Sequence, residues 1–101
     1  MSISSSLSTD GQELQINIEG RFDFNVHSSF RRAYEEPGNE VGSYIVDMTA
    51  ASYLDSSALG MLLLLRDYAG GDSASITIVH CNDDIKKIFA ISNFEQLFDI
   101  K

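Results

Sequence analysis

The segment from Tyr44 to Gly71 constrains the fold more than any other part of the chain. A short run of β-forming residues, Tyr44 to Val46, leads through small and polar residues to Asp55, Ser56 and Ser57, which stand directly before a long apolar stretch. Asp and Ser favour the position before a helix, because their side-chain oxygens accept hydrogen bonds from the unpaired amides of the first turn. The pattern predicts a strand, a polar turn and a helix. Two hydroxyls and a carboxylate would then lie at the positive end of the helix dipole, where a phosphate is stabilised.

The composition limits the classes of protein to which the chain can belong. With 101 residues, of which 44% are hydrophobic, we expect one domain, 1–101, that buries about two-thirds of its unfolded surface. Seven basic and fifteen acidic residues give a net charge of -8, which argues against nucleic acid and anionic membranes as partners. The single cysteine, Cys81, excludes an internal disulfide and a zinc-binding cysteine cluster.

Neither a signal peptide nor a membrane span is expected from the sequence. The N-terminus has no basic residue and no apolar core of signal-peptide length. The longest apolar run, Leu59 to Leu65, is too short to cross a bilayer. We therefore expect a cytoplasmic protein that is not inserted in a membrane.

The residues before the central segment predict a hairpin followed by a helix. Met1 to Leu7 can form an edge strand, and Glu13 to Glu19 alternates apolar and polar residues until Gly20 breaks the pattern. Apolar residues then recur at helical spacing from 26 to 34, with Asn25 as the expected cap. We expect this helix to end at Pro37-Gly38-Asn39, because proline cannot donate the next amide.

The residues after the central segment add a strand and a helix. Gly70-Gly71-Asp72 is expected to end the central helix, Ile76 to Val79 to form a strand, and Asn82-Asp83-Asp84 to start the next helix. Gln96 to Ile100 is a candidate final strand. The order ββαβαβα, with this additional strand, favours parallel neighbours and right-handed crossovers. We therefore expect an α/β domain in which helices pack against a mixed sheet.

Three segments resemble the STAS-domain anti-sigma-factor antagonists. Val46-Asp47-Met48, followed by Tyr53-Leu54-Asp55-Ser56-Ser57-Ala58-Leu59-Gly60, looks like the strand and the D-S-S/T-G-L-G turn of that family. Gly20-Arg21-Phe22-Asp23 is similar to its G-x-L/F-D motif, and residues 85–94 resemble its closing V-x-x-x-F-x-x-x-G-L segment. Ala58 and Asn93 stand where the family usually has glycine, and the side chain of Ala58 is expected to restrict the approach of a kinase's nucleotide. The resemblance implies the STAS fold, a mixed central sheet with helices packed mainly on one face.

The same resemblance implies a function in partner switching. The unphosphorylated domains of that family bind an anti-sigma factor, commonly a serine kinase, and so free a sigma factor. Phosphorylation of a serine ends the binding, and a PP2C-type phosphatase restores it. Carried over to this sequence, the phosphoacceptor is Ser56, and the residues expected to support it or to bind the partner are Asp23, Asp55, Ser57, Ala58, Leu59 and Gly60. The resemblance implies no enzymatic activity of the chain itself, no cofactor and no metal.

Several other interpretations stay open or lack a required part. Asp55-Ser56-Ser57 also fits a capping cluster with no further role, although one such residue is enough for capping. The resemblance equally allows a constitutive STAS subunit that docks to the ATPase of a bacterial lipid-uptake transporter. A serine hydrolase would need a G-x-S-x-G elbow, which is missing, and a base, for which only His27 and His80 are available.

Two remaining expectations concern residues of the central segment. A receiver-like phosphoacceptor at Asp47 would need a neighbouring acidic cluster to hold magnesium, and the first strands end without one. Tyr53 and Leu54 fit either an exposed apolar contact or the core, and we expect the core, because large apolar side chains are more often buried than exposed.

Overall fold

A five-stranded mixed sheet forms the centre of the molecule. The computed structural model describes residues 3–38 and 40–101, and its strands are β1 (Ile3–Leu7), β2 (Glu13–Phe22), β3 (Ser43–Leu54), β4 (Ile76–Val79) and β5 (Asp99–Ile100). The strands lie in the sheet in the order of the sequence. β1 is antiparallel to β2, and every later pair of neighbours is parallel.

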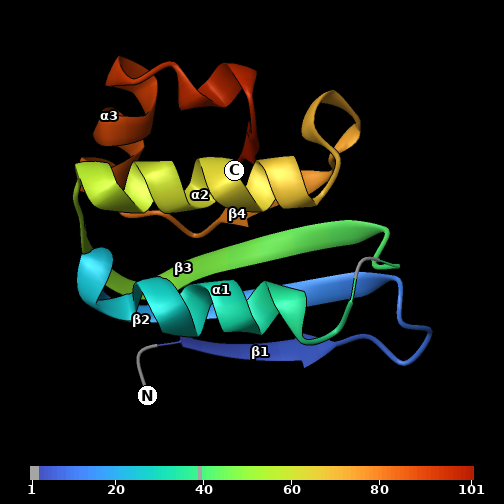
Figure 1. Ribbon diagram of the computed structural model, residues 1–101. Helices are drawn as coiled ribbons and strands as arrows, with labels where there is room; N and C mark the ends of the chain where they lie inside the picture. The colour runs from blue at the N-terminus through green and yellow to red at the C-terminus, as the bar shows by residue number, and fades with distance from the viewer. Residues whose placement is uncertain (1–2, 39) are drawn as a thin grey trace.

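Helices cover one face of this sheet. They are α1 (His27–Glu35), α2 (Ser56–Tyr68) and α3 (Asp83–Ile91), and short 3-10 turns form η1 (Phe24–Val26), η2 (Gly71–Ser73) and η3 (Phe94–Gln96). α1 and α2 lie side by side across the sheet, and α3 lies beyond α2 on the side of β4 (Figure 1). The predicted arrangement, a mixed sheet with helices mainly on one face, is confirmed.

The hydrophobic core lies between the sheet and the helices. Alternate residues of β2 and β3 are buried on the helix side, and they meet aromatic residues of α1 and aliphatic residues of α2; the buried set includes Leu14, Ile16, Ile18, Tyr44, Val46, Met48, Phe30, Tyr34, Met61, Leu62 and Leu65. On the other face, Gln15, Asn17 and Asp47 remain partly exposed. This alternation is the period-2 pattern of strands that are covered on one side.

The two central strands are longer than the sequence predicts. Gly20 was expected to end the second strand, but β2 continues to Phe22, so that prediction is wrong. Gly20 adopts a left-handed φ of 72°, and the pairing with β3 shifts register around it. This is the behaviour of a β-bulge, which bends a strand without ending it. β3 likewise runs to Leu54, well beyond Val46.

The chain ends with a shorter strand than expected. Phe94–Gln96 is a 3-10 turn, and only Asp99–Ile100 pairs with β4, so the prediction of a strand from Gln96 is correct only at its end. Asn93 precedes this turn in the left-handed conformation, with φ 62°. Asparagine tolerates that conformation better than other non-glycine residues, which explains how it replaces the usual glycine.

The start of α1 also differs from the prediction. Asn25 does not cap the helix; instead the side chain of Asp23 accepts from the amide of Asn25 at 3.0 Å and caps η1, which leads into α1. α1 ends at Glu35, shortly before Pro37 as predicted. Met1, Ser2 and Asn39, on which parts of the predictions fall, lie outside the described residues. No helix in the described part of the chain has the length and apolar character needed to cross a membrane.

Candidate functional site at the start of α2

Strand ends and helix starts meet at one edge of the sheet. β2, β3 and β4 are parallel, so their carboxyl ends lie together, and η1, α2 and α3 each begin just after one of them. Phe22 pairs with Leu54 in the register of β2 and β3, and the amide of Asp55 donates to the carbonyl of Phe22 at 3.4 Å. Asp23 and Asp55 therefore follow adjacent positions, and the structure brings them to the same surface.

Asp55 is the N-cap of α2. Its backbone is extended, and its Oδ1 accepts from the amide of Ala58 at 3.1 Å and from the hydroxyl of Ser57 at 2.6 Å. The pKa of the Asp55 carboxyl is held below its usual value, above all by the hydrogen bond from Ser57, with smaller contributions from the Ala58 amide and the charge of Arg21. Asp55 therefore remains ionised at neutral pH and fixes the conformation of the turn.

The two serines of the turn have different roles in this geometry. Ser57 is half-buried, and its hydroxyl is engaged with Asp55. Ser56 is exposed in the first turn of α2, and no hydrogen bond from its hydroxyl is found among the described residues. Of the two hydroxyls, that of Ser56 is the one an enzyme can reach without breaking a hydrogen bond of the cap.

The next three residues of the predicted site point in different directions. Ala58 is fully buried, so its side chain reaches neither a partner nor a kinase's nucleotide, and the expectation that it restricts nucleotide approach is wrong. Leu59 is half-buried and packs against the core. Gly60 is exposed, and a Cβ built there would meet nothing within 4 Å.

Sequence reasoning missed an arginine beside this turn. The Arg21 guanidinium lies 4.2 Å from the ring centroid of Tyr53, and its Nε is 3.4 Å from Oδ2 of Asp23. Arg21 and Tyr53 are register partners on β2 and β3. The sequence does hold a signal for this pairing, because each strand ends in a buried apolar residue followed by aspartate. Aligning Phe22-Asp23 with Leu54-Asp55 puts Arg21 next to Tyr53.

Tyr53 and Leu54 were both expected in the core, and only Leu54 is buried there. Tyr53 is 41% exposed, because neighbouring residues of a strand point to opposite faces and the helices cover only the face to which Leu54 belongs. The phenol ring instead supports the guanidinium of Arg21.

Within the described residues, the ring and hydrogen-bond contacts of the two histidines and Asp47 do not involve the turn at Asp55. His27 stacks on Phe24, with ring centroids 5.0 Å apart. Nδ1 of His80 lies 3.2 Å from Oδ1 of Asp47, which also accepts from the hydroxyl and the amide of Thr49. Burial raises the pKa of Asp47, but these hydrogen bonds outweigh it and the net pKa is lowered. Within residues 3–38 and 40–101, no group of three or more His, Cys, Asp or Glu side chains is arranged to hold a metal ion.

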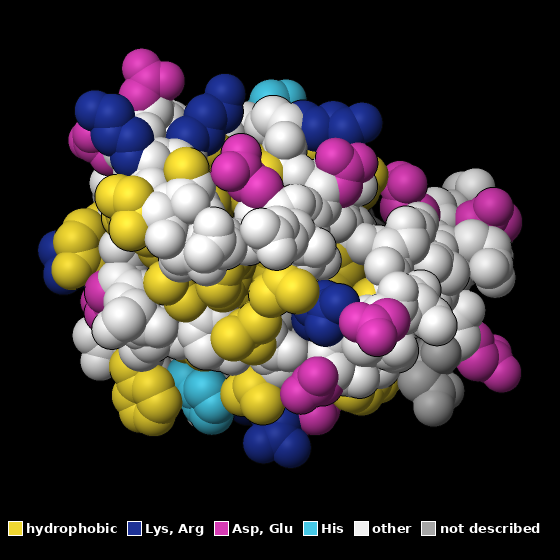
Figure 2. Space-filling model, turned by 90° about the horizontal axis from the view of Figure 1, so that it is seen from above, with side chains coloured by type: hydrophobic (Ala, Val, Ile, Leu, Met, Phe, Trp, Pro, Cys, Tyr) yellow, Lys and Arg dark blue, Asp and Glu magenta, His cyan; other side chains and the backbone are white. Residues whose placement is uncertain are grey.

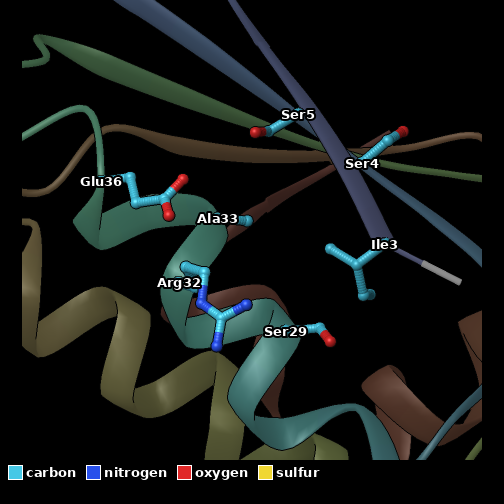
Figure 3. A pocket seen from close by; sticks show the side chains of 7 residues that line it. All are labelled: Ile3, Ser4, Ser5, Ser29, Arg32, Ala33 and Glu36. Atoms are coloured by element: carbon cyan, nitrogen blue, oxygen red, sulfur yellow. The ribbon is translucent and has the colours of Figure 1, made fainter. Parts of the chain in front are cut away.

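Hollows and apolar patches lie outside the turn itself. One pocket of about 150 Å³ lies between β1 and α1 (Figure 3), and its lining residues are Ile3, Ser4, Ser5, Ser29, Arg32, Ala33 and Glu36.

Seen from above α3 and η3, hydrophobic side chains form a band among charged ones (Figure 2). Exposed leucines and an isoleucine lie on or next to α2, α3 and η3, namely Leu63, Leu64, Ile91 and Leu97. Single exposed apolar side chains of this kind are common on protein surfaces and do not by themselves mark a binding site.

Comparison with known proteins decides the family. The family model described as "Mlab, STAS domain" matches residues 5–99. The chain belongs to the STAS-domain family. A STAS-domain containing protein of Pseudomonas aeruginosa is 58% identical over 100 residues, which cover 99% of each chain. The recognition of a STAS domain from the residues around Asp55 is thereby confirmed.

Solved structures of low sequence identity share the fold of this STAS domain. A candidate anti-sigma factor antagonist from Thermotoga maritima matches with a TM-score of 0.81 at 11% identity, over 97% of this chain and 84% of that one. The phosphorylated form of the Bacillus cell-fate determinant SpoIIAA matches with a TM-score of 0.66 at 14% identity, over 98% and 90% of the two chains. At these identities the likeness shows the fold alone, and it is the fold of anti-sigma-factor antagonists.

Proposed function

We propose that this STAS domain is an anti-sigma-factor antagonist that works by partner switching. In its unphosphorylated form it binds an anti-sigma factor, which can itself be a serine kinase, and so frees a sigma factor. Phosphorylation of Ser56 ends that binding, and a PP2C-type phosphatase restores it. The domain performs no catalysis in this scheme.

The observation that carries this proposal is the contrast between two neighbouring hydroxyls. The hydroxyl of Ser57 donates to Asp55 at 2.6 Å, whereas Ser56 is exposed and its hydroxyl makes no hydrogen bond within the described part of the chain. A kinase needs an accessible hydroxyl on a well-defined backbone, and the Asp55 cap supplies that backbone. Asp55 and Ser57 thus act as supporting residues.

The electrostatics of the site explain how one phosphate can control binding without unfolding the domain. A phosphoserine adds close to two negative charges, and the N-terminus of a helix favours negative charge. The domain therefore keeps its fold. A partner that docks over the turn meets new charge and bulk on a chain whose net charge is already -8.

Binding of three variants to the anti-sigma factor tests the proposal. Ser56→Asp is expected to keep the fold and weaken binding at least about 100-fold, which corresponds to roughly 2.7 kcal/mol. Ser56→Ala is expected to bind like the wild type and to resist inactivation by the kinase. Ser73→Asp is the matched charge control: Ser73 is an exposed serine in η2, beyond the far end of α2, and this change should leave binding unchanged. Equal affinity of Ser56→Asp and Ser56→Ala, measured by calorimetry, would overturn the proposal.

A second candidate function is a constitutive subunit that docks to the ATPase of a bacterial lipid-transport complex. The description of the matching family model favours it, since that model is named for an Mlab-type STAS domain. The two functions differ in what the cell does to Ser56. Intact-mass analysis of the native protein would show a phosphate for the switch. The subunit would instead carry no modification and co-purify with a membrane complex.

A further inference from the structure

We infer that Arg21 is the positioning residue for a phosphate on Ser56, and that phosphorylation draws its guanidinium away from Tyr53 and Asp23. This inference rests on the proposed function, because it assigns a response to the modification of the same serine. It concerns an arginine on β2 that neither the cap nor the core requires.

The contacts of Arg21 hold it near the turn without using all of its donors. Its side chain is 66% exposed, whereas that of Asp23 is only 13% exposed. It meets Asp23 through Nε alone at 3.4 Å, and among the described residues its terminal nitrogens donate no hydrogen bond. Exposed ion pairs of this kind contribute little to stability, at most about 1 kcal/mol. The two terminal nitrogens are therefore available to another acceptor.

Arg21 lies on β2 next to the end of β3, the strand that leads into the first turn of α2. Tyr53, its register partner, lies three residues before Ser56 on the strand that feeds the helix. The ring of Tyr53 supports the guanidinium from one side at 4.2 Å. The pKa of Asp55, the residue next to Ser56, is lowered mainly by the hydrogen bond from Ser57, and the charge of Arg21 adds a smaller contribution in the same direction. The field of this cation thus reaches the turn in the unmodified protein.

The charges around Ser56 explain why a phosphate needs this cation. Asp23 and Asp55 place two carboxylates at the same surface, and both repel an added dianion. Between Arg32 and Arg66 the sequence holds no Lys or Arg, and Arg66 is paired with Asp72 at the far end of α2. Among the described strands, Arg21 is the one Lys or Arg, and it lies beside the strand that leads into this turn, whereas Lys86 and Lys87 belong to α3.

A phosphate competes well with Asp23 for this guanidinium. Phosphate oxygens accept two parallel hydrogen bonds from the terminal nitrogens of an arginine, which is stronger than a single contact through Nε. When Arg21 turns to the phosphate, Asp23 loses its cation and the ring of Tyr53 is uncovered. The partner therefore meets three changes at once: a new dianion, an unpaired carboxylate and a bare aromatic ring.

The pKa of the phosphate tests this inference directly. Phosphoserine is installed at position 56 during translation, and the second ionisation of the phosphate is followed by ³¹P NMR as a function of pH. Arg21→Gln is expected to raise this pKa by roughly half a unit relative to the unsubstituted phosphoprotein, because the nearby positive charge is lost. Arg21→Lys should lie in between, since lysine keeps the charge and loses the planar fork.

Arg31→Gln is the matched control. Arg31 is similarly exposed at 60% and is also held by one carboxylate through Nε, but on the surface of α1. It should leave the phosphate pKa unchanged. Equal pKa values of the phosphate in Arg21→Gln and in the unsubstituted phosphoprotein would overturn the inference. Because the phosphate is installed without a kinase, the experiment gives an answer even if the proposed function fails, and affinity for the anti-sigma factor tests that function separately.

Discussion

The first turns of α2 and α3 are built on one plan but carry different charges. Both helices start at the same edge of the sheet after a polar cap, and each cap accepts from the amide of the third helical residue: Asp55 from Ala58 at 3.1 Å, and Asn82 from Ile85 at 2.8 Å. The side chains of Ala58 and Ile85 are both buried. The first two helical residues differ, because α3 has Asp83 and Asp84 where α2 has Ser56 and Ser57.

This difference concerns the negative charge at two helix starts that lie at the same edge of the sheet. α3 has permanent carboxylates at the positive end of its dipole. α2 has hydroxyls at the corresponding positions, and in the proposed function a negative charge is added there by phosphorylation and removed again. Asp83 thus serves as an internal model of a charged Ser56: a carboxylate at the first helical position, after a capping residue, in a stable helix.

Exchanging the buried third residues of the two helices should have the largest effect on stability. Ile85→Ala removes a fully packed side chain from α3 and is expected to cost about 2–5 kcal/mol of unfolding free energy. Ala58→Ile forces extra volume into the core under α2 and should cost about 1–3 kcal/mol. Urea unfolding midpoints measure both. If either variant unfolds at the wild-type midpoint, the two turns do not pack as described.

Removing the two capping side chains should have the next largest effect on stability. The penalty should depend on pH for the cap of α2 and not for the cap of α3. Asp55→Ala and Asn82→Ala are each expected to cost about 1 kcal/mol at neutral pH, because each leaves a first-turn amide without its acceptor. The folded pKa of Asp55 is depressed, so its carboxylate stabilises the fold above the unfolded pKa, and this contribution is lost as the pH falls through the folded value. Asn82 does not titrate.

The measurement is urea unfolding of both variants at about pH 7 and about pH 2. The penalty of Asp55→Ala should shrink in acid, and that of Asn82→Ala should stay constant after the wild type is measured under the same conditions. Asp55→Asn is the control that keeps a neutral cap, and its stability should lie close to that of the wild type. A pH-independent penalty for Asp55→Ala would contradict the ionic role of this cap.

Much of this comparison could be predicted from the residues, and the rest depended on pairing between distant strands. The caps of α2 and α3 are local, since Asp55 and Asn82 each precede an apolar helical pattern, and both were predicted. The cap of the first helix was misplaced, because η1 intervenes and Asp23 rather than Asn25 supplies the acceptor. A short 3-10 turn leaves no periodic signal in a sequence.

The contacts of Arg21 with Tyr53 and Asp23 could not be predicted from the local sequence, for a different reason. Its contacts depend on the register of two strands separated by a helix, and the bulge at Gly20 shifts that register. Gly20 was interpreted as the end of the strand, which left Arg21 and Phe22 in a loop. Recognition of the motif supplied Ser56 and Asp23 as candidate site residues, but a motif does not show which residues are in contact.

Substitution of Gly60 should have a smaller effect on the stability of the domain. It stands at the fifth position of α2, where α3 has the exposed Lys87, and a Cβ there would meet nothing within 4 Å. Gly60→Ala is therefore expected to stabilise the domain by about 0.5–1 kcal/mol, since glycine weakens a helix interior. Thermal unfolding measures this gain, with Ala90 of α3, already an exposed helical alanine, changed to glycine as the converse control. A destabilised Gly60→Ala would mean that this part of α2 is more crowded than the structure shows.

The smallest effect on stability should come from the negative charge at the first helical position. Ser56→Asp gives α2 the first helical residue of α3, and the helix dipole is expected to stabilise it by about 0.3–0.5 kcal/mol, partly offset by repulsion from Asp55. Asp83→Ser makes the reverse change in α3 and should lose a similar amount. Added salt should reduce both effects, because the charges are exposed. Unfolding at low and high ionic strength measures them. A Ser56→Asp variant that is clearly less stable than the wild type would mean that a charge at this position disturbs the fold, and loss of partner binding could then no longer be attributed to the surface alone.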